Sequence, residues 1–208
     1  VAMKGYWLHE LLLLPVFTIM VLLSFRYVVL VEARSSTFAG DGSTPSLIAS
    51  VTDATFLNMA SDAFYNQTSK FLYIIAGGSA CFTVFNVSEA GQPTRTGAYC
   101  SSELLSGGWL MEVDSGRALA FVPALDKDRL TVLNITEPTS PRFVSSFYDD
   151  GSYIDGPLGL AIDGNFVLLT NQHSDCLVIL DYMDPQSASL EGYYCDETNL
   201  EQPQRVSK

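Results

Sequence analysis

Basic side chains are scarce in this chain. Its 208 residues include 11 Lys and Arg against 23 Asp and Glu, and the formal net charge at pH 7 is −12. Nucleic-acid binding depends on Lys and Arg that contact phosphates, so this composition argues against nucleic acid as a partner. It also disfavours docking onto an anionic lipid surface. The charge balance fits a soluble extracellular protein and leaves cation binding open.

Histidine is nearly absent too. Of the two histidines, His9 lies in the apolar leading segment, so only His173 could serve a Ser-His-Asp arrangement, and a His-rich metal site cannot be built. His173 belongs to the polar segment 171–175, which we predict to be a solvated turn. The chain also lacks nucleophile-elbow, P-loop and dinucleotide-binding motifs. We therefore predict no catalytic residue.

Helical periodicity is missing after residue 45, and a repeat of about 48 residues takes its place. The repeat is clearest in an apolar segment that contains Asn86 in its first copy, Asn134 in its second and Asp181 in its third. These residues lie 48 and 47 positions apart. A fixed period of this size indicates one small unit stacked several times.

Each copy contains four short apolar segments rich in Val, Ile, Leu, Phe and Tyr, as half-buried strands are. Hairpin-turn compositions at 114–116 and 163–165 join the first two strands, and proline in the later turns stops the third strand from continuing. The predicted strands are 57–63, 71–76, 82–88 and 94–99 in the first copy, 109–113, 118–122, 130–136 and 143–148 in the second, and 158–162, 166–170, 177–183 and 189–194 in the third.

Four-stranded antiparallel meanders at this spacing are typical of β-propeller blades. We predict an all-β propeller with about three such blades; a β-sandwich or another β-solenoid is the alternative. Residues 46–51 match the fourth strand of the repeat and are expected to form one extra strand. Because propellers usually have ~4–8 blades, we expect an incomplete propeller in a chain truncated at its C-terminus. Assembly with a second chain is the less favoured explanation.

The expected organisation follows from these patterns. The chain divides into a leader (1–33), a linker (34–45), the propeller (46–196) and a polar tail (197–208). The propeller divides into a partial blade (46–55) and blades at 56–105, 106–155 and 156–196.

The apolar segment and the turn after it resemble the repeat of the LVIVD family, whose consensus runs like LxIVDVSDPxxPxxVGxY. The second copy reads LTVLNITEPTSPRFVSSF over residues 130–147, and the third reads LVILDYMDP over 177–185. The resemblance covers roughly residues 46–196. It implies a β-propeller in a secreted or surface protein, with no catalytic site shared across the family.

The leading segment predicts the compartment. Residues 11–31 are almost entirely apolar, are broken by Arg26 and follow Lys4. Small or aliphatic residues stand where a signal peptidase reads, so we predict a hydrophobic helix that is a signal peptide, cleaved after about Ala33. The alternative is an uncleaved membrane anchor, because the run approaches the ~20 residues that span a bilayer. Both imply the secretory pathway and an extracellular or cell-surface protein, with membrane contact only through this segment.

Four cysteines occupy matching places in two of the three copies. Cys81 and Cys100 flank the last two strands of the first copy, Cys176 and Cys195 flank those of the third, and 19 positions separate each pair. The second copy lacks both. An antiparallel hairpin places the two positions opposite each other, so we predict the disulfides Cys81–Cys100 and Cys176–Cys195. The alternative, four free thiols, requires a reducing compartment.

Three sequons for N-glycosylation begin at Asn66, Asn86 and Asn134. Asn66, in a polar loop, is the best acceptor. The other two fall where the repeat uses Asn or Asp for turn chemistry, which is the competing explanation for them.

Carboxylates suggest one weak metal site. Asp149, Asp150 and Asp155 flank Gly151 in a connection between blades and could offer oxygen ligands to Ca²⁺. A solvated loop is the favoured explanation, and no cofactor is otherwise expected.

Two aromatic residues, Trp109 and Tyr153, lie near the start of predicted inner strands. They could line a channel mouth, although packing between blades is the favoured role. The predicted function is non-enzymatic binding of an extracellular protein or glycan. The alternative is a propeller-type hydrolase or lactonase that uses channel carboxylates and a metal. Its channel positions would be Asn58 with Met59, Leu110 with Met111, and Gly159 with Leu160, which are largely apolar and disfavour it.

Overall fold

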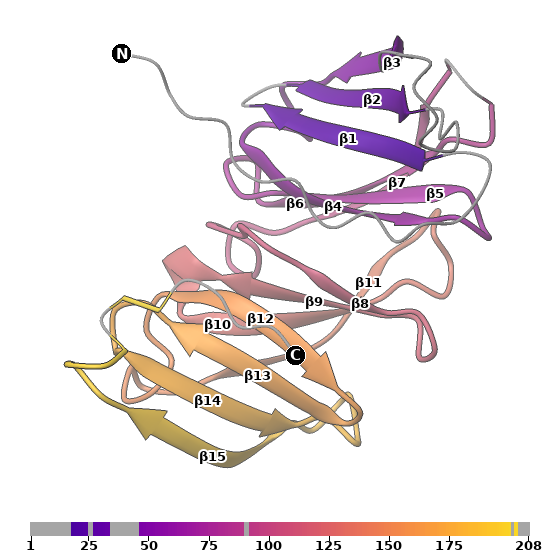
Figure 1. Cartoon of the computed structure of the whole chain (residues 1–208). Coiled ribbons are helices and arrows are strands. Elements are labelled where there is room, and N and C mark those ends of the chain that lie inside the picture. The colour runs from indigo at the N-terminus through magenta and orange to yellow at the C-terminus, as the bar shows by residue number, and fades with distance from the viewer. Residues whose placement is uncertain (1–17, 25–26, 34–45, 90–91, 201, 204–208) are drawn as a thin grey trace, which may run out of the picture.

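The computed structural model describes residues 18–24, 27–33, 46–89, 92–200 and 202–203 (Figure 1). These residues form four antiparallel sheets that follow one another in chain order. Within these ranges the only helical element is a single 3-10 turn, η1 (Leu125–Lys127). The prediction of an all-β propeller with three four-stranded blades is confirmed.

Each four-stranded sheet is a meander whose strands pair in chain order. The first blade contains β4 (Ala60–Asn66), β5 (Phe71–Ala76), β6 (Cys81–Asn86) and β7 (Thr94–Cys100). The second contains β8 (Glu112–Asp114), β9 (Leu119–Ala124), β10 (Arg129–Asn134) and β11 (Arg142–Tyr148). The third contains β12 (Pro157–Asp163), β13 (Phe166–Asn171), β14 (Cys176–Asp181) and β15 (Ser189–Cys195). Only β4 and β8 begin more than two residues from the predicted start, each three residues later.

The last two strands of every blade share one irregularity. A β-bulge follows the fourth residue of the third strand, which is Val84 in β6, Val132 in β10 and Ile179 in β14. A bulge adds one residue to one strand and resets which side chains share a face. Its constant place means that residues of the three blades can be compared position by position.

A three-stranded sheet precedes the three blades and is called here the N-terminal sheet. It contains β1 (Thr18–Ser24), β2 (Tyr27–Ala33) and β3 (Ser46–Thr52), in the order β1-β2-β3. Strands β2 and β3 pair in the same register as the last two strands of a blade, with the bulge again after the fourth residue, Leu30. The predicted extra strand therefore exists, but it is the outer strand of a fourth sheet and not a lone strand.

The leading segment was predicted to be a hydrophobic helix. The part of it that the structure describes forms strands instead. Residues 18–24 and 27–33 are strands, while 11–17 and 25–26 lie outside the described residues. No helix among the described residues is long and apolar enough to span a bilayer. Cleavage after about Ala33 stays a prediction.

The core consists of three apolar clusters, each between two successive sheets. Because side chains alternate along a strand, each inner sheet contributes to the cluster on either side. In β6, Phe82 and Val84 pack toward the second blade, whereas Phe85 packs toward the N-terminal sheet, where Val51 of β3 contacts its cluster. The third cluster joins the second and third blades around Phe121.

The outer strand of one blade touches the proline turn of the next. A Cβ atom at Gly97 in β7 would clash with the backbone carbonyl oxygen of Pro138. At the equivalent position of β11, Ser145 has a side chain, and its hydroxyl donates to the carbonyl of Pro185 at 2.6 Å. The blades therefore approach closely at this point.

Replacing Gly97 with Val should lower the free energy of unfolding by about 2 kcal/mol, because the turn that contains Pro138 must move to admit the side chain. Gly97→Ser is the matched control and should cost less, since its hydroxyl can donate to that carbonyl as Ser145 does. Urea denaturation followed by circular dichroism measures both. A loss below about 0.5 kcal/mol for both variants, as at an ordinary surface position, would show that this approach is not tight.

Candidate functional site

The first strands of the blades form the inner edge of the molecule. Contacts between neighbouring sheets run through β4, β8 and β12, together with β1 and β9. In each meander one end carries the connection into the first strand and the turn between the second and third strands. Both disulfides lie there, so we call it the disulfide end, and the opposite end the sequon end.

Both predicted disulfides are present. Cys81–Cys100 and Cys176–Cys195 join residues that lie directly opposite each other in the last hairpin of the first and third blades. In the second blade, Arg129 and Tyr148 occupy the same pair of positions, and the guanidinium lies 5.3 Å from the centre of the Tyr148 ring. A cation–π contact thus stands where the other two blades have a covalent bond.

Each blade has one equivalent position on the inner edge at the disulfide end. Only one of these three positions holds a carboxylate. These positions hold Asp62 and Gly159, which pair with the fifth residues of β5 and β13, and Leu110, which lies between the Gly108–Ala124 bridge and the Glu112–Phe121 pair. The prediction was correct for Leu110 and Gly159 but wrong for the first blade, where it named Asn58 and Met59. The reason is that the pairing of β4 with β5 is irregular between Ala60 and Asp62, which places Asp62 opposite Ile75.

Asp62 connects two blades at this edge. Its Oδ2 accepts a hydrogen bond from the backbone N–H of Met111 at 2.9 Å, and its Oδ1 accepts one from Ala63 at 2.9 Å. The carboxylate therefore fixes the entry to β8 against β4.

Trp109 is the exposed aromatic residue at this edge, with 42% of its surface accessible. The backbone before it is held firmly, because the carbonyl of Gly108 accepts a hydrogen bond from the Ser61 hydroxyl at 2.9 Å. Gly107 has φ +70°, where a side chain would also meet Asp126. Trp109 is thus presented to solvent from a well-fixed support.

The second predicted aromatic, Tyr153, does not join Trp109. Its ring stacks on Tyr193 of β15 with the ring centres 4.0 Å apart. For both aromatic residues the favoured prediction was packing. Tyr153 packs, on Tyr193, whereas Trp109 is exposed.

The three predicted calcium ligands have separate partners. Asp149 accepts hydrogen bonds from the backbone N–H groups of Gly151 and Tyr153, and Asp150 accepts one from the Ser152 hydroxyl. Within the described ranges, no group of three His, Cys, Asp or Glu could hold a metal ion.

Asp155, the third of these carboxylates, lies 3.0 Å from Nδ1 of His173. Both side chains are exposed. His173 belongs to the turn between β13 and β14, as predicted, and the pair ties this turn to the connection before β12.

The three sequon asparagines all lie at the sequon end. The side-chain oxygens of Asn66, Asn86 and Asn134 accept hydrogen bonds from the backbone N–H two residues further on, at 3.0, 2.8 and 2.8 Å. Asp181 makes the same bond at the equivalent position of the third blade, so the predicted turn role is correct. Glycosylation itself stays a prediction, and these bonds leave the side-chain nitrogen, which a glycan would modify, outside the turn.

The sequon end also has a depression of about 440 Å³ between the second and third blades. Its lining residues are Glu112, Val113, Asp114, Ser115, Ile162 and Gly164.

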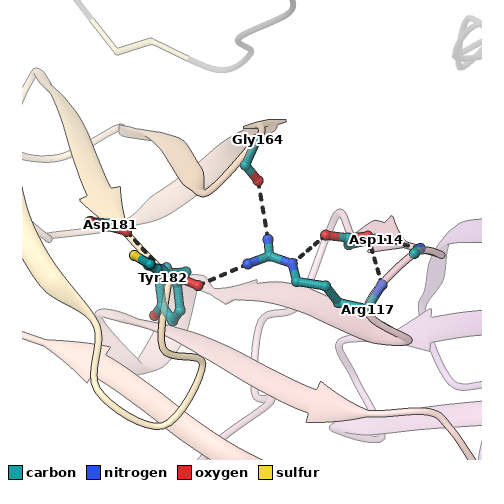
Figure 2. A network of polar contacts seen from close by, with 7 residues as sticks. Asp114, Arg117, Gly164, Asp181 and Tyr182 are labelled. Carbon is teal, nitrogen blue, oxygen red and sulfur yellow. Dashed lines mark hydrogen bonds and ion pairs between the residues drawn. The ribbon is translucent and has the colours of Figure 1, made fainter.

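Arg117 holds one wall of this depression together (Figure 2). Its Nε donates to Asp114, and its terminal nitrogens donate to the carbonyls of Tyr182 and Gly164 at 2.8 and 3.2 Å. Partial burial alone would raise the pKa of Asp114, but the hydrogen bonds and charge of Arg117 outweigh it and hold that pKa below its usual value. Sequence reasoning missed Arg117, because its partners in the third blade lie 47 and 65 residues away.

No protein-family model and no curated protein matches this chain. Solved structures similar to it include a candidate 6-phosphogluconolactonase from Bacteroides fragilis NCTC 9343, with a TM-score of 0.68 at 9% identity, covering 91% of this chain and 57% of that one. A protein of unknown function from Desulfotomaculum acetoxidans DSM 771 gives 0.64 at 13%, covering 90% and 54%. The periplasmic gluconolactonase of Pseudomonas aeruginosa gives 0.54 at 18%, covering 84% and 52%.

At these identities the likeness shows the fold alone. The chain spans little more than half the length of these proteins.

Proposed function

We propose that this chain is a non-enzymatic binding module of the secretory pathway that holds an extracellular protein or glycan at its disulfide end. The observation that carries the proposal is Trp109, which is exposed at the inner edge on a fixed backbone. The three sequons lie at the opposite end, so glycans attached there would leave the disulfide end accessible.

The proposed compartment rests on covalent chemistry. Disulfides persist in oxidising compartments and are rare in the cytosol, and every cysteine of the described residues is bonded. Three sequons and the resemblance to the LVIVD family support the same compartment.

The proposed contact rests on the physics of aromatic anchors. Tryptophan supplies a large rigid contact area at low entropic cost, and it is enriched among residues that dominate binding energy. Two carboxylates contact the chain on either side of it: Asp62 accepts a hydrogen bond from the N–H of Met111, and the exposed Asp126 accepts one from the Ser106 hydroxyl. Together with the net charge of −12, they favour a neutral or basic partner.

Trp109→Ala should weaken binding by about tenfold or more, the usual effect of removing a central aromatic anchor. The probes are an array of immobilised neutral oligosaccharides and a panel of purified extracellular matrix proteins. Phe143→Ala is the matched control, because Phe143 is equally exposed, at 42%, but lies on the outer strand β11. Absence of wild-type binding to every probe, or equal weakening by both variants, would contradict the proposal.

The second candidate is a lactonase, and the fold it shares with the P. aeruginosa gluconolactonase is what favours it. The inner edge argues against it, because Asp62 is the only carboxylate in three equivalent positions and already holds the backbone of Met111. Hydrolysis of gluconolactone above the uncatalysed rate with added Ca²⁺, Mg²⁺ or Zn²⁺ would replace the binding proposal with this one.

A further inference from the structure

The second blade differs from the first and third in the side chains at its disulfide end. The pairing registers match five such positions between the blades. The first blade fills them with Ser61, Gly78, Ser79, Cys81 and Cys100, and the third with Leu158, His173, Ser174, Cys176 and Cys195. The second fills them with Trp109, Asp126, Lys127, Arg129 and Tyr148. Together with Glu103, which contacts two of them, these last five residues are called here the second-blade surface.

Two exposed aromatic residues mark the ends of this surface. Trp109 lies at the inner edge and is 42% exposed, and Tyr148 ends the outer strand β11 and is 63% exposed. Three strand spacings of about 4.8 Å separate the first strand of a blade from the fourth, so the two aromatic residues are roughly 14 Å apart across the blade. Trp, Tyr and Arg are the residue types enriched among those that dominate the free energy of protein–protein binding.

Ion pairs hold the middle and outer part of this surface in one arrangement. Glu103 pairs with Lys127 at 3.8 Å and with Arg129 at 3.0 Å. The Arg129 guanidinium also lies over the Tyr148 ring, 5.3 Å from its centre. These contacts restrict long side chains before any partner arrives, so less side-chain entropy remains to be lost on binding.

The surface is electrically balanced in a strongly acidic chain, whose net charge is −12. At pH 7 it carries two negative and two positive charges, on Glu103, Asp126, Lys127 and Arg129. Glu103 contacts both cations, and Asp126 accepts a hydrogen bond from the Ser106 hydroxyl at 2.9 Å. Because these charges already have partners within the chain, binding here depends on the aromatic residues and favours an uncharged ligand.

The second blade has no disulfide at the place where it presents these residues. Arg129 and Tyr148 stand directly opposite each other, where the first and third blades are cross-linked. A disulfide that closes a loop of this length stabilises a fold by more than a cation–π contact at an exposed site does. Stability therefore does not explain the pair, whereas a binding role does.

We propose that an uncharged, extended segment of a protein partner lies across the second-blade surface, from Trp109 to Tyr148. This inference rests on the proposed function and deepens it, with a protein and not a glycan as the ligand. Extended chain rises about 3.3 Å per residue, so about four or five residues cover the distance. The second blade packs between the first and the third, so described residues flank this surface on both sides (Figure 1).

The test selects ligands for the whole chain, produced in an oxidising host, from a random-peptide library displayed on phage. The selected peptides are synthesised, and fluorescence anisotropy gives their Kd. Trp109→Ala and Tyr148→Ala should each weaken binding at least about tenfold. Phe143→Ala is the control and should leave Kd unchanged, because Phe143 is 42% exposed on the same strand but lies at the sequon end. Added salt should change Kd by less than about threefold, since few charges are neutralised on binding.

A double variant removes the surface without weakening the fold. Arg129→Cys together with Tyr148→Cys places two cysteines at the positions that are bonded in the other two blades. The variant should keep its circular dichroism, show the third disulfide in non-reducing peptide mapping, and bind the selected peptides at least about tenfold more weakly.

The outcomes separate this inference from the proposed function. Peptides that depend on Trp109 but tolerate every change at Tyr148 would leave the proposed function standing and overturn the inference. Selection of no peptide would overturn it, as would an affinity that falls steeply with salt. Neutral oligosaccharides that bind through both Trp109 and Tyr148 would also overturn it, because the ligand of this surface would then be a glycan.

Discussion

Removing both disulfides should lower the free energy of unfolding by about 6 kcal/mol, with about 3 kcal/mol from each. Each bond closes a loop of 19 residues, Cys81–Cys100 in the first blade and Cys176–Cys195 in the third. In the chain-entropy model, the stabilisation arises from the conformations that the cross-link denies to the unfolded chain. The loss is large relative to the ~5–15 kcal/mol that ordinarily separates folded from unfolded states.

Two double variants, one for each pair with both cysteines changed to Ser, should each lose about half of this free energy. The two bonds lie in different blades and share no partner, so their effects should add. Guanidinium denaturation of each variant is the measurement. The wild type in excess reductant is the control. Its free energy of unfolding should match that of a variant in which all four cysteines are changed to Ser. A loss below about 1 kcal/mol in each double variant would contradict the loop-closure argument.

The disulfides and most strands could be predicted because they depend on local register. Cys81 and Cys100 belong to one hairpin, and antiparallel pairing across a single turn fixes which residues are opposite. The absence of both cysteines from the second blade was informative for the same reason. The pair Arg129 and Tyr148 at that place could not be predicted, because a cation–π contact depends on rotamers that no spacing specifies.

The N-terminal sheet was missed because its strands show no alternation. A strand that is apolar at successive positions has the same composition as a membrane helix or a signal peptide, and periodicity cannot separate them. The sequence of β2, YVVLVEA, is of this kind. The bulge after Leu30, which reveals that β2 and β3 belong to the repeated module, becomes visible only in the pairing.

The predicted channel position of the first blade was wrong for a related reason. The pairing of β4 with β5 is irregular between Ala60 and Asp62, so the strand continues to Asn66 and the channel position moves from Asn58 to Asp62. A bulge at the start of a strand interrupts the alternation of side chains from which the position would be predicted. The exposure of Trp109 was likewise invisible, since it depends on the contact between Gly108 and Ser61 of another blade.

Arg117→Met should lower the free energy of unfolding by about 2–3 kcal/mol, the range for hydrogen bonds to a charged group when a buried partner is left behind. The guanidinium joins Asp114 of the second blade to the carbonyls of Tyr182 and Gly164 in the third (Figure 2). Tyr182 is fully buried, and its ring meets Phe121 edge-to-face with the centres 5.3 Å apart. Its carbonyl would therefore lose its donor where water has poor access.

Arg117→Lys is the matched control, since it keeps the charge near Asp114 but cannot serve three acceptors in one plane, and it should recover less than half of the loss. The dependence on pH separates the ion pair from the carbonyl bonds. The folded-state pKa of Asp114 lies below its unfolded value, so its contribution is present above about pH 4 and disappears as the pH falls through the folded-state pKa. The difference between wild type and Arg117→Met should therefore shrink in acid without vanishing, because the carbonyls of Tyr182 and Gly164 do not titrate. A difference that is constant between neutral pH and strong acid would mean that Asp114 contributes nothing to the joint between these blades.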